Sequence, residues 1–193
     1  MHPSTQSLWL ETQPAESFPA LDGDIKADVA VVGAGITGVT AALLLARAGM
    51  SVALVEARRV GELDTGHTTA HITELLDTRY YKLISDFGEE GARAAAESQR
   101  AAIERIAGFI REEHIECDFL RVPAFLYAET EEQEADVVRE AKAAVRLGLD
   151  AVIVQDTSLP FRFGPRSAST IRRNSIRSVT LRAWRAPWNG CMG

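Results

Sequence analysis

The sequence predicts an α/β fold built around a βαβ unit, and three observations predict it. Two short apolar runs rich in β-branched residues, at 27–32 and 51–57, have the length and composition of buried strands. Residues 36–48 between them are apolar or small and stop at Gly49, as a helix does. A glycine-rich turn separates the first run from this helix. A strand, a helix and a strand this close together form a βαβ unit with a parallel strand pair.

The turn has the pattern G-x-G-x-x-G, which opens a helix directly after a strand. In that setting the first glycine permits the tight turn, and the second lets a pyrophosphate approach the backbone. The third glycine lets the helix pack closely on the sheet. The N–H groups and the positive helix end suit a phosphate. The candidate phosphate-binding residues are Gly33, Ala34, Gly35, Ile36, Thr37 and Gly38.

Glu56 ends the second predicted strand, 23 positions after Gly33. A carboxylate there accepts hydrogen bonds from the two ribose hydroxyls of an adenosine, and it repels a 2′-phosphate, which disfavours NADP. Arg58 and Arg59 follow at once and weaken that exclusion. The pattern therefore predicts a Rossmann-like dinucleotide site. Spacing alone does not decide between FAD and NAD, and glycines so spaced also occur in purely structural βαβ turns.

The other elements are predicted from prolines and periodicity. Residues 1–26 are expected to form an extended arm, because three prolines there oppose a helix. A polar loop at 58–73 enters a helix near Thr69. Periods of 3.6 and 2 predict helices and strands in the following segments. They are a helix at 88–114, two strands at 117–122 and 124–129 around Pro123, a helix at 131–147 and a strand at 149–156.

Composition and charge exclude several classes of protein. Apolar residues make up 46% of the 193-residue chain and charged residues 25%, as in ordinary soluble proteins. The net charge of −6 argues against a nucleic-acid partner. The apolar run at 39–46 is too short to span a membrane, and the first residues show no secretory signal, so we expect a cytoplasmic location. Cys117 and Cys191 lack metal-ligand spacing, so no metal site is expected.

These stretches resemble the D-amino-acid-oxidase-like (DAO) family of FAD-dependent oxidoreductases. Within that family the chain is most similar to the subgroup that carries a C-terminal Rieske iron–sulfur domain. The resemblance covers residues 7 to about 161. The stretches that carry it are SLWLET, LDGDIKADVAVVGAGITGVTAALLLARAGMSVALVEA, TGHTTAHIT at 65–73, FGEEGAR and CDFLRVPAFLYAET.

The resemblance implies FAD as the cofactor, with its pyrophosphate on the glycine turn and its ribose on Glu56. Ala57 and Arg58 lie just past that acid, where the family lines the adenine side. A further loop is expected near the pyrophosphate and the flavin. Its residues are Thr65, Gly66, His67, Thr68 and Thr69. For His67 and His71 we favour a role as helix caps or solvated surface over a contact with the flavin, and no catalytic base is assignable.

The resemblance also implies a domain organisation. An arm at 1–26 precedes a Rossmann-like FAD-binding portion at 27–116, and 117–160 begins a mixed α+β substrate domain. Residues 161–193 form a tail with seven arginines, no acid and no sustained period, which we expect to be disordered. The fold is thus expected to be incomplete. In full-length relatives, flavin would remove a hydride from a small amine or related substrate.

The tail departs from the family, and it lacks the Rieske ligands expected of full-length relatives. An altered reading frame or a truncated gene is the expected cause, and a genuine basic tail that binds an acidic partner is the alternative. Two other functions stay open: a nucleotide-binding module without redox activity, and an inactive fragment. Because missing neighbour strands would leave the sheet edges unpaired, we expect weak or no retention of flavin.

Overall fold

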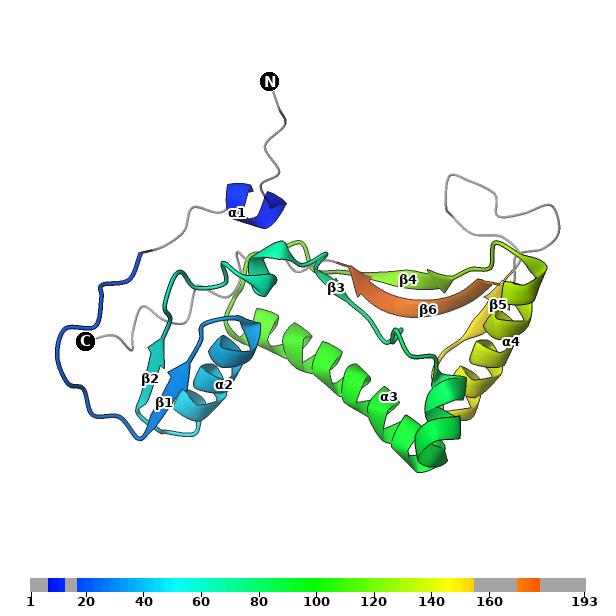
Figure 1. Ribbon diagram of the computed structural model, residues 1–193, viewed down its shortest axis with the longest axis horizontal. Helices are drawn as coiled ribbons and strands as arrows, with labels where there is room; N and C mark the ends of the chain where they lie inside the picture. Colours follow the sequence, from blue (N-terminus) through cyan, green and yellow to red (C-terminus); the bar gives the residue numbers. More distant parts are fainter. Residues whose placement is uncertain (1–6, 13–16, 155–169, 178–193) are drawn as a thin grey trace, which may run out of the picture. The chain divides into compact units, whose positions relative to one another are not determined.

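The computed structural model describes residues 7–12, 17–154 and 170–177 of the chain (Figure 1). They fall into two compact units. The first contains the described residues up to Thr69 together with 115–117. The second contains 70–114 and the described residues from Asp118 onward. No helix in these ranges has the length and apolar character needed to cross a membrane.

The first unit contains the predicted βαβ unit. Strand β1 (Val29–Val32), helix α2 (Ile36–Arg47) and strand β2 (Val52–Val55) follow one another, and the two strands pair in parallel. Helix α2 buries Val39, Ala42 and Leu43. It ends two residues before Gly49, whose positive φ of 85° suits a glycine after a helix. The strands and the helix confirm the α/β prediction.

Hydrogen bonds at the start of both strands fix their register. The Asp28 carboxylate accepts from the Ser51 N–H at 2.8 Å and from the Ser51 hydroxyl at 2.9 Å. These bonds lower the pKa of Asp28, because they favour the charged carboxylate. Within the described residues the sheet has only these two strands. Each strand therefore has one edge without a partner among the described strands, as expected, and Val32 is 83% exposed.

The arm and the polar loop differ from the sequence predictions. Helix α1 (Leu8–Thr12) lies in the arm that was expected to be extended, because five residues without proline fit between Pro3 and Pro14. The loop contains a 3₁₀ turn, η1 (Asp64–His67), and a short strand, β3 (His71–Ile72). The predicted helix near Thr69 is wrong. Ala70 has a φ of 55°, which is incompatible with entry into a right-handed helix.

Two helices with small residues at their contact build the core of the second unit. Helix α3 (Tyr80–Glu112) confirms the predicted helix but starts earlier, with a break at Gly88, where φ is 73°. Helix α4 (Glu131–Arg146) begins at the predicted position, where the Thr130 side chain accepts from the Gln133 N–H. Alanines let the helix backbones approach closely, and larger side chains close the core. Its most buried members include Ala92, Ala96, Val137, Ala141, Ala144, Leu147 and Leu149.

A four-stranded antiparallel sheet completes the second unit. Strand β6 (Thr170–Arg177) pairs with β3, with β4 (Leu120–Leu126) and with β5 (Val152–Val154). Strand β4 is one continuous strand, so the prediction of two strands separated by Pro123 is wrong. Among the described strands β4 lies at an edge of the sheet, where a residue without an N–H donor is tolerated.

Strand β6 also corrects the expectation for the Arg-rich tail. Residues 170–177 are ordered by pairing with three strands, whereas disorder was predicted for 161–193. The rest of that tail lies outside the described residues. The compact units group α3 with β4 and α4, unlike the predicted ranges 1–26, 27–116, 117–160 and 161–193. A grouping by contacts does not define where a domain begins or ends, so those ranges stay a prediction.

Tyr80 offers a test of the second unit, because its side chain is fully buried and its hydroxyl donates to the Glu74 carbonyl at 2.8 Å. Tyr80→Phe should lower the free energy of unfolding by about 1–2 kcal/mol, since it removes the hydrogen bond that the buried side chain donates to a part-buried carbonyl. Urea denaturation measures the change. Tyr81→Phe, at the next and only half-buried position, should change the value by less than about 0.5 kcal/mol. Equal effects of the two substitutions would contradict the assignment.

Candidate functional site

The turn between β1 and α2 is held against the end of β2. Gly33 has a φ of 96°, a conformation that favours glycine, and its N–H donates to the Val55 carbonyl at 2.8 Å. Ala34 is 1% exposed, and its carbonyl accepts from the Gly61 N–H at 2.9 Å. The backbone of this turn is therefore fixed by both the neighbouring strand and the loop beyond it.

Gly38 shows why the third glycine of the pattern is required. A Cβ built at Gly38 would lie 1.8 Å from the Gly33 carbonyl oxygen and 3.1 Å from the Gly33 carbonyl carbon. Both are backbone atoms, so no side-chain movement relieves the overlap. The helix thus packs on the turn as closely as the sequence predicted.

The Glu56 carboxylate reaches across to the turn. One oxygen accepts from the Ala34 N–H at 2.8 Å, and the other accepts from the Arg58 N–H at 3.0 Å. The bond from Ala34, followed by the bond from Arg58, holds the pKa of Glu56 below its ordinary value. The group is therefore ionised at neutral pH. The Ala57 N–H also contributes to the lowered pKa. A carboxylate has about four lone-pair sites, so Glu56 keeps acceptor capacity beyond these backbone donors.

Several N–H groups at the start of α2 are open to a ligand. Those of Gly35, Thr37 and Gly38 have no hydrogen-bond partner within the described part of the chain. The Ile36 N–H donates to the Thr65 hydroxyl oxygen at 3.0 Å. A Cβ built at Gly35 would lie 3.3 Å from the same oxygen. The space beside Gly35 that the sequence suggested for a pyrophosphate is therefore shared with Thr65.

The loop that carries Thr65 is fastened by helix α1. Gly66 is buried, and a Cβ there would lie 2.6 Å from the Gly61 carbonyl oxygen and 2.9 Å from Leu10 Cδ2. The Ser7 hydroxyl donates to the Gly66 carbonyl, and the Trp9 indole N–H donates to the Thr68 carbonyl at 2.6 Å. Sequence reasoning missed these positioning contacts, although the SLWLET stretch pointed to the segment.

The structure brings only some of the predicted residues together. The glycine turn contacts both Glu56 and Thr65, and the neighbouring Gly66 is buried against Gly61 and Leu10. The other predicted residues are exposed and make no side-chain contact with the turn; they are Ala57, Arg58, His67, Thr68 and Thr69. His67 Nδ1–H donates to the Leu63 carbonyl at 2.9 Å, within its own loop. No cluster of His, Cys, Asp or Glu that would hold a metal occurs among residues 7–12, 17–154 and 170–177.

These features fit a dinucleotide. Open N–H donors at the positive end of α2 suit a diphosphate, and an ionised carboxylate with free lone pairs suits a pair of ribose hydroxyls. The carboxylate, which follows β2, contacts the same turn that carries the N–H donors, because the Ala34 N–H donates to it. Their arrangement therefore matches the one expected at the carboxyl ends of parallel strands.

Comparison with known proteins gives several relatives. YhfW of Bacillus subtilis (strain 168), whose name describes a Rieske 2Fe-2S iron–sulfur protein, is 35% identical over 155 residues, covering 80% of this chain and 30% of YhfW. Gamma-glutamylputrescine oxidoreductase of Escherichia coli (strain K12) is 29% identical, covering 65% of this chain and 29% of that protein. This chain thus spans less than a third of the length of either relative.

A solved structure of L-amino acid deaminase from Proteus vulgaris has a similar fold. Its TM-score is 0.62 at 16% sequence identity, over 83% of this chain and 41% of the deaminase. At that identity the likeness supports the Rossmann-like α/β assignment and nothing finer.

Gly38→Ala tests the close contact of α2 with the turn. It should lower the free energy of unfolding of the first unit by about 1–3 kcal/mol, the usual cost of overpacking, because the new methyl group meets backbone atoms. Thermal denaturation followed by circular dichroism measures the loss. Gly108→Ala is the matched control, since a Cβ there, near the C-terminal end of α3, meets only Glu112 Oε1 at 3.5 Å. That control should be neutral or stabilising, and a neutral Gly38→Ala would contradict the geometry.

A family model described as FAD dependent oxidoreductase (DAO) matches residues 28–170. The match passes residue 161, where the resemblance was expected to stop, so that limit was set too early. FAD is the cofactor of this family, and the oxidoreductase interpretation is favoured over a nucleotide-binding module or an inactive fragment. The chain belongs to the DAO family of FAD-dependent oxidoreductases.

Proposed function

We propose that the Gly33–Gly38 turn and Glu56 hold FAD, and that the chain acts as the FAD-binding portion of an oxidoreductase. The single observation that supports this most is the pairing of open N–H donors on the turn with an ionised carboxylate bonded to Ala34. The donors of Gly35, Thr37 and Gly38 bind the diphosphate. The remaining lone pairs of Glu56 accept from the two ribose hydroxyls.

Thr65 extends this proposal to the following loop. Its hydroxyl oxygen already accepts from the Ile36 N–H at 3.0 Å, so its own O–H is free to donate to a phosphate oxygen. A hydroxyl that accepts a hydrogen bond from the helix N-terminus is polarised by it and becomes a better donor to a phosphate oxygen. Gly66 and helix α1 keep the loop in place for this role.

The remaining candidate residues have supporting roles in the proposal. Ala57 and Arg58 follow Glu56 and border the adenine side, while His67, Thr68 and Thr69 border the flavin side. The carboxylate at Glu56 disfavours NADP, since a 2′-phosphate would meet a like charge. These assignments rest on position in the motif and on the Arg58 N–H bond to Glu56.

Substrate and partners are proposed from the relatives. Bound flavin supplies a hydride acceptor, and the names of the relatives that act on gamma-glutamylputrescine and on L-amino acids favour a small amine as hydride donor. The likeness to YhfW favours a Rieske iron–sulfur domain as electron-transfer partner in the full-length protein. A cytoplasmic location, like the interpretation of the chain as a fragment, stays a prediction.

Titration with FAD tests the cofactor assignment. Although little flavin is expected to stay with the chain through purification, FAD added in excess should bind measurably, seen as quenched flavin fluorescence and a raised melting temperature. Glu56→Gln should weaken binding about tenfold, because a neutral amide accepts ribose hydrogen bonds less well and presents a donor to the Ala34 N–H. Glu62→Gln, in the next loop, is the matched control and should bind like the unchanged chain. FAD binding that is identical in all three proteins would overturn the assignment.

The acid limb of stability provides a second test of Glu56. Because its pKa is lowered on folding from the ordinary value of 4.5, its contribution is complete above about pH 4.5 and is lost as pH falls through the folded pKa. The unchanged chain should therefore exceed Glu56→Gln in unfolding free energy by about 1 kcal/mol at pH 7. Urea denaturation from pH 7 to 3.5 should show that difference shrinking. A constant difference would contradict the role of the charge.

A further inference from the structure

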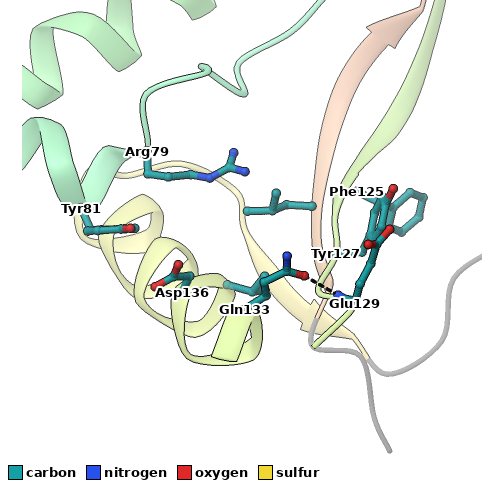
Figure 2. Close-up of a pocket in the computed structure, with 9 residues that line it drawn as sticks. Arg79, Tyr81, Phe125, Tyr127, Glu129, Gln133 and Asp136 are labelled. Atoms are coloured by element: carbon teal, nitrogen blue, oxygen red, sulfur yellow. Dashed lines mark hydrogen bonds between the residues drawn. The ribbon is translucent and has the colours of Figure 1, made fainter. Parts of the chain in front are cut away.

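A cavity of about 500 Å³ lies in the second unit, and none of the residues that line it is among the proposed FAD residues (Figure 2). The start of α3, the end of β4 and the first two turns of α4 form its walls. The volume falls in the range of small-molecule pockets. All the residues that line it belong to one compact unit.

Arg79 provides the main charged group of this cavity. It immediately precedes α3, and its guanidinium extends toward the space between α4 and β4 (Figure 2). The residue is half-buried. No side chain in the described ranges forms an ion pair or a hydrogen bond with its guanidinium. A half-buried guanidinium with a fork of unused donors is suited to a carboxylate.

Two acidic residues, Asp136 and Glu129, also line the cavity. Asp136 lines the cavity from α4 and forms an ion pair with Arg139, whose guanidinium carbon stands 5.1 Å from the centre of the Tyr81 ring. Glu129 lies in the turn before α4, with an exposed carboxylate. A ligand anchored on Arg79 therefore meets negative charge at its far end.

The cavity also has an apolar wall. Val137 is 3% exposed and belongs to the core between α3 and α4. Leu126 packs against that core from the end of β4, and Tyr81 adds a ring from α3. A ligand with an apolar body thus finds hydrocarbon contact beside the cation.

Hydrogen bonds hold these walls in place. The Gln133 side-chain oxygen accepts from the Glu129 N–H at 2.7 Å, and the Thr130 hydroxyl accepts from the Gln133 N–H at 3.3 Å, which fixes the turn into α4. Glu140, only 1% exposed, accepts from the Tyr81 N–H at 3.2 Å and joins α4 to the start of α3. A pocket held this way loses little entropy on binding.

We propose that this cavity binds a small organic monocarboxylate with an apolar body. The carboxylate lies on the Arg79 guanidinium, and the body lies against Leu126 and Val137. Glu129 disfavours a second carboxylate at the far end of the ligand through like-charge repulsion. The residues that line the site all belong to the second unit and do not include the proposed FAD residues, so its binding is tested without added cofactor.

Three probes of equal carbon length test this proposal: hexanoate, its neutral isostere hexanamide, and the dicarboxylate adipate. Titration of the full chain is followed by ¹H–¹⁵N NMR. Hexanoate should bind with a dissociation constant on the order of millimolar, as expected for so few atoms. It should shift the amides of Arg79, Leu126 and Gln133. Hexanamide and adipate should each bind at least about fivefold more weakly.

Variants assign the binding to named groups. Arg79→Gln should weaken the binding of hexanoate about tenfold. Arg79→Lys should cause a smaller loss of affinity, because lysine keeps the positive charge but not the paired N–H donors of the guanidinium. Glu129→Gln should reduce the difference in affinity between hexanoate and adipate, because it removes the negative charge that repels the second carboxylate. Arg111→Gln, at the far end of α3 and outside the cavity, is the control and should change nothing. Unshifted amides elsewhere in each variant's spectrum confirm folding.

Three outcomes would overturn the proposal. The first is that hexanoate causes no saturable shifts at the cavity amides. The second is that hexanamide binds as well as hexanoate, which would make the site purely apolar. The third is that Arg79→Gln and Arg111→Gln bind hexanoate equally, which would place the anion elsewhere.

Discussion

The hydrogen bond from the Ala34 N–H to Glu56 is the interaction on which the candidate site depends. It joins the turn after β1 to the residue after β2, beside the backbone bond from Gly33 to Val55. Both strands are parallel, so this is the carboxyl edge of the sheet, where ligands bind in open α/β folds. One carboxylate thus fixes the turn that presents the N–H donors, and it stays ionised for the ribose that we propose as its ligand. The Ala34–Glu56 hydrogen bond thus both positions the turn and lowers the pKa of the carboxylate.

Hydrogen bonds at the amino ends of the two strands help to explain how a two-stranded sheet keeps the turn beside Glu56. An isolated two-stranded sheet is marginal in water. Here Asp28 and Ser51 form reciprocal hydrogen bonds at the amino ends, while Glu56 and Gly33 close the carboxyl ends. Slippage by one residue would break both sets of bonds. The register that places the turn beside the acid is therefore specified at both ends, although Val32 stays exposed on the sheet.

Local signals predicted the βαβ unit, and non-local contacts account for the errors. Gly33 to Glu56 carry their own turn, helix and strand signals, so the unit and most of its site followed from the sequence. Contacts between distant segments were invisible to it: helix α1 bonds to the loop near Thr68, and β6 pairs with strands up to about a hundred residues away. Pro123 indicated a break because the sequence does not show which strand lies at an edge. Asp28 and Ser51 belong to no motif.

The proposed FAD site and the cavity beside Arg79 differ in the same way: the first depends on local sequence signals, and the second depends on contacts between distant segments. A diphosphate site made of backbone N–H groups needs glycines at fixed spacing, because a Cβ at Gly38 would overlap the Gly33 carbonyl. Such a requirement leaves a pattern in the sequence. The cavity beside Arg79 is assembled from the start of one helix, the end of a strand and the start of another helix, and none of its side chains needs a special backbone conformation. It leaves no pattern, so only the folded second unit, held at the Tyr81–Glu140 contact, brings its cation and its apolar wall together.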